Sequence, residues 1–164
     1  MSQHPPAPAC AGRLGPDHPA GLAAMPPLDA WLYQQQSSGS ACMTATYLAR
    51  FEGPAPALPD LRARARQRLQ PFRRLRVLPH ILDGCGTEAG NWPHWQESDE
   101  LAVEHHITAL GDMSPASLSL HITHLLAEPL DHGRPPWQLH LLPTEDGFTL
   151  LLRAHHALLD GQSL

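Results

Sequence analysis

The chain has 164 residues, enough for one domain with a substantial hydrophobic core. Its 42% hydrophobic content and formal net charge of −5 are typical of a soluble globular protein, and the negative charge argues against a nucleic-acid partner. No apolar run approaches the roughly 18 residues that a membrane-spanning helix needs. The three cysteines, Cys10, Cys42 and Cys85, are widely spaced and lack a CxxC pair, so we expect a cytoplasmic protein with neither a disulfide framework nor a metal site.

Residues 1–26 are rich in proline and lack the charged-then-apolar order of a signal peptide. We therefore expect a disordered leader over 1–26 and an ordered domain over 27–164. The first elements predicted in that domain are a helix at 27–32 and a strand at 41–51. A helix at 58–70 and a strand at 72–78 follow.

Residues 81–91 are rich in glycine and predict a loop, and residues 92–95 and 103–108 predict extended segments. Ser114 and Pro115 mark the start of a helix, because serine caps helix N-termini and proline suits the first turn. Leu118, Ile122, Leu125 and Leu126 then share one helical face.

Residues 137–142 and 148–154 predict a β-hairpin whose two strands flank a Glu-Asp-Gly turn. The mixture of strands and helices along the chain indicates an α+β fold, with a mixed sheet covered by helices.

The second hairpin strand runs into the motif His155-His156-Ala157-Leu158-Leu159-Asp160-Gly161. Neighbouring side chains on a strand point to opposite faces, so at most one of the two histidines can face a substrate. An imidazole titrates near neutral pH and suits a general base that removes a hydroxyl proton. Gly161 leaves room for a turn or for a substrate chain. A pair of packed core histidines is the non-catalytic alternative.

The chain resembles the bacterial wax ester synthase/acyl-CoA:diacylglycerol acyltransferase family, within the chloramphenicol-acetyltransferase-like superfamily. The similar segments follow one another in the family's order and end with the histidine motif. One departure is Pro136, where the family usually has leucine. The segments are Pro27-Leu28-Asp29 with Trp31-Leu32, Phe51-Glu52-Gly53, Pro71-Phe72-Arg73-Arg74-Leu75, Trp92, Glu104-His105-His106-Ile107, Leu130-Asp131, Arg134-Pro135-Pro136-Trp137, His155 to Gly161, and Ser163.

This resemblance implies that His156 is the catalytic base, while His155, Asp160 and Gly161 support the motif. Asp160 would shape the loop through a salt bridge to an arginine. Trp137 and Ser163 are candidates for the substrate channel, although a tryptophan at this place is more often a core anchor. Acyl-CoA and either diacylglycerol or a fatty alcohol would be the substrates, with no cofactor and no metal.

In this superfamily two similar subdomains enclose the substrate channel, and the chain corresponds to the N-terminal one. We therefore expect a missing C-terminal subdomain, and only peripheral contact with a membrane or lipid droplet. Two alternatives remain open, a condensation-type N-acyltransferase domain and a non-catalytic, truncated half-domain.

Seven arginines form the one concentrated run of charge. They could attract the phosphates of CoA or an anionic membrane. Their helical spacing does not give one tight stripe, so we expect a solvated face instead. They are Arg62, Arg64, Arg66, Arg68, Arg73, Arg74 and Arg76.

Overall fold

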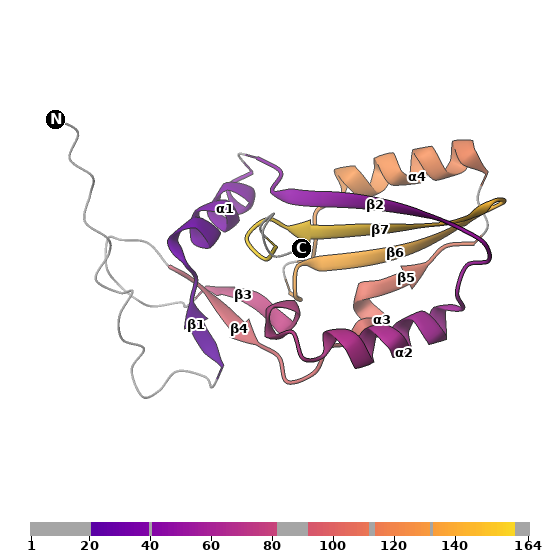
Figure 1. Cartoon of the computed structure of the whole chain (residues 1–164). Coiled ribbons are helices and arrows are strands. Elements are labelled where there is room, and N and C mark those ends of the chain that lie inside the picture. The colour runs from indigo at the N-terminus through magenta and orange to yellow at the C-terminus, as the bar shows by residue number, and fades with distance from the viewer. Residues whose placement is uncertain (1–20, 40, 82–91, 112–113, 132, 160–164) are drawn as a thin grey trace.

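The computed structural model describes residues 21–39, 41–81, 92–111, 114–131 and 133–159. This part of the chain contains one antiparallel sheet, one mixed sheet and four α-helices (Figure 1). None of the described helices is long and apolar enough to cross a bilayer.

A four-stranded sheet forms the centre of the molecule, in the order β2-β7-β6-β5. Strands β2 (Thr44–Glu52), β7 (Gly147–His155) and β6 (Trp137–Thr144) pair antiparallel, whereas β5 (Ile107–Ala109) runs parallel to β6. The sheet is therefore mixed, and its interior strand β7 carries the histidine motif at its end.

A three-stranded sheet lies beside the end of the larger sheet at which β7 finishes (Figure 1). It contains β1 (Leu22–Ala24), β4 (Pro93–Glu97) and β3 (Val77–Ile81), with β4 in the middle. Both pairs are antiparallel. Trp95 of β4 points into the main core, so this small sheet is fastened to the rest of the fold by apolar contact.

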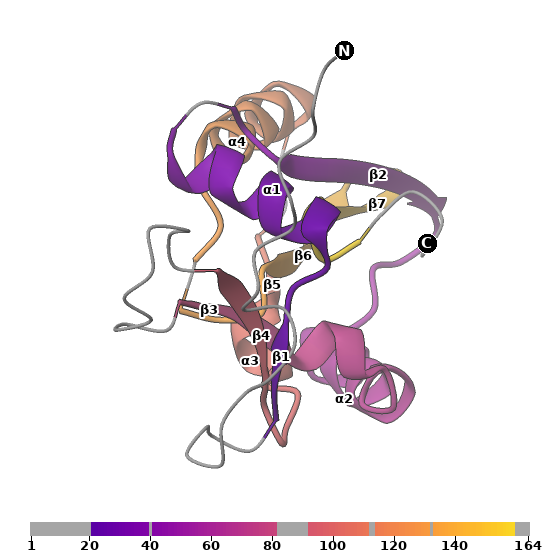
Figure 2. The ribbon, with the colours of Figure 1, turned by 90° about the vertical axis from the view of Figure 1, so that its left-hand side faces the viewer.

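Helices cover both faces of the larger sheet (Figures 1 and 2). The helices α2 (Leu58–Leu69) and α3 (Val103–His106) lie on one side, and α4 (Pro115–Ala127) lies on the other. Helix α1 (Pro27–Ser37) lies near the end of β7. The main core gathers around Trp95 and Trp137, and a smaller cluster joins α4 to the sheet.

The hairpin prediction and the helix start at Ser114 are both confirmed. Strands β6 and β7 flank the expected turn, and the Ser114 hydroxyl accepts a hydrogen bond from the Ser117 N–H at 3.3 Å. The apolar face of α4 is narrower than expected, however. Leu125 is buried against the sheet, whereas Leu126 is 50% exposed. Leu126 points away from the sheet, because each residue of a helix is turned by about 100° from the one before it.

Two predicted extended segments are wrong in part. Residues 73–76 form a short 3₁₀ helix before β3 begins, and the three arginines there donate hydrogen bonds to a carboxylate and a carbonyl oxygen. Residues 103–106 form the single turn α3, which buries both Val103 and His106. Two residues three positions apart share a helical face, whereas they would point to opposite sides of a strand.

The start of the ordered region is also earlier than predicted. β1 pairs with β4 within the expected leader, and Met25 is only 2% exposed. The backbone N–H of Met25 donates to the Pro93 carbonyl oxygen at 3.0 Å. Residues 21–26 are thus held by a sheet partner more than 65 positions away, which local composition does not reveal. Residues 1–20 and most of the loop predicted at 81–91 lie outside the described residues.

Candidate active site

The strand β7 ends at His155, and a turn over residues 156–158 follows at the end of the sheet (Figure 1). His155 is 1% exposed, and its backbone N–H donates to the Pro136 carbonyl oxygen at 3.0 Å. Its ring nitrogen Nδ1 accepts from the Ala157 N–H at 3.0 Å. The ring also lies 6.0 Å from the ring of Tyr33 in α1. His155 therefore holds the turn in shape from inside the protein.

His156 has the opposite environment, since its side chain is exposed. Its backbone N–H donates to the Met43 carbonyl oxygen at 2.8 Å, just before β2 begins. The main chain at this histidine is fixed while its imidazole is available to solvent. A positioned and accessible imidazole can remove a proton from a hydroxyl group.

Three apolar residues anchor the turn beneath His156. Ala157, Leu158 and Leu159 are all buried and belong to the main core. The N–H groups of Leu158 and Leu159 both donate to the carbonyl oxygen of His155, at 2.9 and 3.2 Å. The exposed imidazole thus stands on a rigid base, as a preorganised catalytic group requires.

Arg74 reaches this turn from the 3₁₀ helix that precedes β3. Its Nε donates to the Leu158 carbonyl oxygen at 2.9 Å, and a terminal nitrogen donates to the Ala157 carbonyl oxygen at 2.6 Å. The same guanidinium pairs with Asp29 of α1 and lies 5.1 Å from the centre of the Trp95 ring. The prediction of a solvated face is therefore wrong for Arg74.

Four further arginines of the run also have protein partners. Arg62 donates to the Ile107 carbonyl oxygen at 2.8 and 3.0 Å, and Arg66 pairs with Glu104. Arg73 and Arg76 both pair with Glu97. The prediction of a solvated face holds for Arg64 and Arg68, which are exposed and have no side-chain partner among the described residues. Sequence alone could not show which arginines of the run have partners, because those partners lie 21 to 84 positions away along the chain.

Trp137 lies in the core, as the alternative to a channel role implied. It is 3% exposed, its indole N–H donates to the Leu75 carbonyl oxygen at 3.0 Å, and its ring stacks on His106 with 4.4 Å between centroids. The other predicted site residues, Asp160, Gly161 and Ser163, lie outside the described residues. The structure therefore brings together the two histidines, their turn and Arg74.

A sequence model of the wax ester synthase/diacylglycerol acyltransferase catalytic domain matches residues 25–163. The chain belongs to this family. The match begins at the buried Met25 and extends through the turn that carries His156.

Two mycobacterial relatives illustrate the similarity. A probable diacylglycerol O-acyltransferase of Mycobacterium tuberculosis, tgs1, is 28% identical over 123 residues, which are 70% of this chain and 25% of the relative. A putative diacylglycerol O-acyltransferase of Mycobacterium bovis is 33% identical over 106 residues, or 61% of this chain and 20% of the relative. This member of the wax ester synthase family thus spans about a quarter of the length of the first of these relatives.

Solved structures share the fold at low identity. The wax ester synthase/diacylglycerol acyltransferase of Marinobacter aquaeolei VT8 matches with a TM-score of 0.60 at 21% identity, over 86% of this chain and 36% of that one. The starter condensation domain of rhizomide synthetase matches with a TM-score of 0.63 at 14% identity, over 86% and 35%. The predicted α+β, chloramphenicol-acetyltransferase-like fold is confirmed.

A second polar group lies on the α4 side of the sheet in this family member, and the sequence interpretation missed it. Arg153 is 1% exposed and donates to the Gln138 side-chain oxygen at 3.0 Å and to the Glu128 carbonyl oxygen at the end of α4. A cation suits that place, because the C-terminus of a helix carries partial negative charge. An arginine within the largely apolar strand 148–154 was the signal that could have revealed it.

Proposed function

We propose that this chain is part of an O-acyltransferase that moves a fatty acyl group from acyl-CoA to diacylglycerol or to a long-chain alcohol. The observation that carries the proposal is the division of the two motif histidines. His155 is buried and bonded to the turn, while His156 is exposed on a rigid base in a chain that belongs to the wax ester synthase family.

In this mechanism the His156 imidazole accepts the hydroxyl proton as the alcohol oxygen attacks the thioester carbonyl. The new carbon–oxygen bond gives a tetrahedral intermediate. Its collapse breaks the carbon–sulfur bond, and the proton passes from the imidazolium to the departing thiolate of CoA. The products are an ester and free CoA. This route needs no covalent acyl-enzyme, and we expect no metal or redox cofactor in it.

We propose that residues 27–164 correspond to the N-terminal subdomain, and that a second subdomain supplies the other wall of the substrate channel. The coverage of about a quarter of the relatives supports this proposal. Several large apolar side chains on the described surface would gain a partner in this way, among them Leu28, Trp31 and Phe72. Any contact with a membrane or lipid droplet would be peripheral.

A condensation-type N-acyltransferase remains the second candidate, because the condensation domain of rhizomide synthetase has a similar fold. That likeness concerns the fold alone. The match of residues 25–163 to the wax ester synthase catalytic domain favours a hydroxyl acceptor.

Purified chain should be assayed with a long-chain acyl-CoA and either diacylglycerol or hexadecanol. We expect His156→Ala to lower the rate of ester formation by a factor of about 10² to 10⁴, the usual contribution of a positioned base. His124→Ala is the matched control, because His124 is an exposed histidine on α4. The assay is repeated with the C-terminal portion of the Marinobacter enzyme added. Ester formation that persists at full rate in the His156 variant would contradict the proposal.

A further inference from the structure

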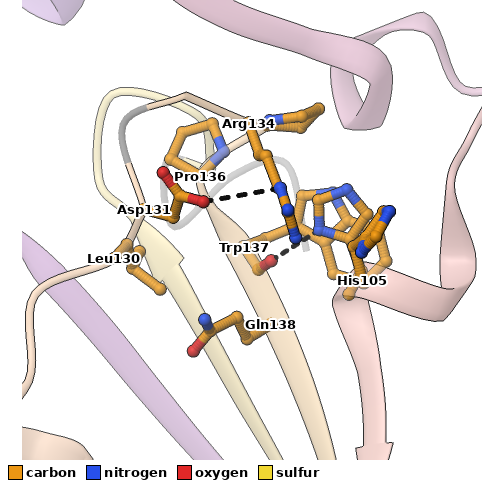
Figure 3. Close-up of a pocket in the computed structure, with 9 residues that line it drawn as sticks. His105, Leu130, Asp131, Arg134, Pro136, Trp137 and Gln138 are labelled. Atoms are coloured by element: carbon orange, nitrogen blue, oxygen red, sulfur yellow. Dashed lines mark hydrogen bonds and ion pairs between the residues drawn. The ribbon is translucent and has the colours of Figure 1, made fainter.

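The two motif histidines are held from opposite sides through their backbones. The His155 N–H donates to the Pro136 carbonyl oxygen at 3.0 Å, and the His156 N–H donates to the Met43 carbonyl oxygen at 2.8 Å. Pro136 lies just before β6 and, with Trp137, lines a small pocket there (Figure 3). β6 pairs with a strand on each side, whereas β2, which begins just after Met43, is an edge strand with β7 as its single partner in the described sheet. His156 therefore depends on the less supported side.

A side chain of α1 supplies the support that this edge lacks. The Gln36 side-chain oxygen accepts from the Met43 N–H at 3.0 Å and lies 3.5 Å from the Thr44 hydroxyl. The oxygen of the amide must face Met43, because a backbone N–H can only donate. Met43 is thus fixed twice, through its N–H by Gln36 and through its carbonyl oxygen by His156.

Helix α1 is itself firmly placed. Ala30 and Tyr33 are buried in the main core, and the Tyr33 ring lies 6.0 Å from the ring of His155. After the helix the chain turns at Gly39, whose φ of 72° lies in the left-handed region that glycine adopts readily. The Ala41 N–H then donates to a carbonyl oxygen in the last turn of α1 at 3.4 Å. The start of β2 is therefore held against the end of α1.

We propose that Gln36 is a positioning residue for the catalytic base. It acts through Met43, whose carbonyl oxygen fixes the backbone from which the His156 side chain projects. A displacement of about 1 Å in a reacting group can slow an enzyme about a hundredfold, so a base on an exposed turn needs support on both sides. The proposal rests on the function proposed above, in which His156 removes the hydroxyl proton.

Hydrogen exchange of the purified chain, followed residue by residue by NMR, tests the support itself. Gln36→Leu removes the acceptor, so the amide hydrogens of Met43 and His156 should exchange about 3- to 10-fold faster. Gln36→Glu keeps an oxygen acceptor and should keep the wild-type rates. Gln34→Leu is the matched control, because Gln34 is an exposed glutamine of the same helix. The amide of the buried Leu151 should keep its rate in every variant, since the expected effect is local.

Acyl transfer tests the role in catalysis, in the assay with the C-terminal portion of the Marinobacter enzyme added. Gln36→Leu should lower kcat about tenfold and leave KM within about twofold, because the base is displaced while the substrate contacts remain. Gln36→Glu should restore kcat, which a loss of general stability would not predict.

Three results would overturn the proposal. The first is unchanged exchange at Met43 and His156 in Gln36→Leu, and the second is an equal increase at Leu151. The third is faster exchange at His156 with an unchanged kcat. Absence of ester formation by the wild-type protein would contradict the proposed function instead, and the exchange rates would still decide whether Gln36 holds His156.

Discussion

The neighbouring residues His155 and His156 have opposite environments. The His155 ring accepts a hydrogen bond from the turn that it supports, and its side chain is removed from water. His156 follows immediately, and its fixed backbone presents the imidazole outward. The two side chains point in opposite directions because β7 ends at His155 and the alternation of side-chain direction continues into the turn. The role of His156 as base stays a prediction until the assay is made.

At the same scale, His140 gives a prediction about pH. Burial is the main factor that lowers the pKa of His140 to about 4, and the charge of Arg153 adds to it. The unfolded chain binds this proton near pH 6.5, whereas the folded chain does not. Stability should therefore fall as pH decreases from about 6.5 to about 4, by up to about 3 kcal/mol from this residue.

Urea unfolding at several pH values measures this loss. His140→Leu should flatten the dependence below pH 6.5, whereas the exposed control His124→Ala should keep it. His106 contributes in the same direction, because its pKa is also lowered. An unchanged pH dependence in His140→Leu would show that the loss arises elsewhere.

At the scale of elements, the hairpin of β6 and β7 determines where the turn of His156 lies. β7 is an interior strand, paired with β2 over its whole length on one side and with β6 over residues 147–154 on the other. Gly147 begins it, opposite Glu52 of β2. The register of this pair fixes the position of His155 against Thr44, eight residues further along.

Gly147→Ala should therefore disrupt the sheet. An added Cβ would lie 2.0 Å from the Phe51 carbonyl oxygen, and backbone cannot move aside as a flexible side chain can. We expect a loss of more than about 3 kcal/mol in the free energy of unfolding, measured by urea denaturation. Gly111→Ala is the matched control, because no atom lies within 4 Å of its added Cβ. Equal stability of the two variants would mean that β2 can withdraw without cost.

At the scale of the whole molecule, Arg74 joins three parts of the chain. Its guanidinium contacts α1 through Asp29, β4 through Trp95 and the turn that carries His156 through two carbonyl oxygens. These partners lie 21 to 84 positions from it. The geometry beneath His156 thus depends on a residue that the sequence interpretation assigned to a solvated face.

Arg74→Gln should lower the free energy of unfolding by about 1 to 3 kcal/mol, because two buried carbonyl oxygens lose a charged donor. We expect ester formation to fall as well, since the turn is no longer held. Arg68→Gln is exposed and should change stability by less than about 0.5 kcal/mol. Both variants are compared by urea unfolding and by the acyltransfer assay. Each loses one positive charge, but only Arg74→Gln also loses contacts with the turn, so the difference between the variants measures those contacts. The two variants behaving alike would rule out this role for Arg74.

The sequence by itself determined the elements that rest on local signals. The cap at Ser114, the turn before Gly147 and the two strands of the hairpin are encoded within a few residues, and the structure contains each of them. The histidine motif also lies within seven residues, so the family resemblance could be stated and was confirmed.

Only the tertiary structure decided which side chains meet. β1 depends on β4, the arginine run divides between bonded and exposed members, and Trp137 packs on His106. Each of these contacts joins residues far apart in the chain. Helix periods and turn residues report the conformation of neighbours, whereas burial and ion pairing depend on how distant segments pack.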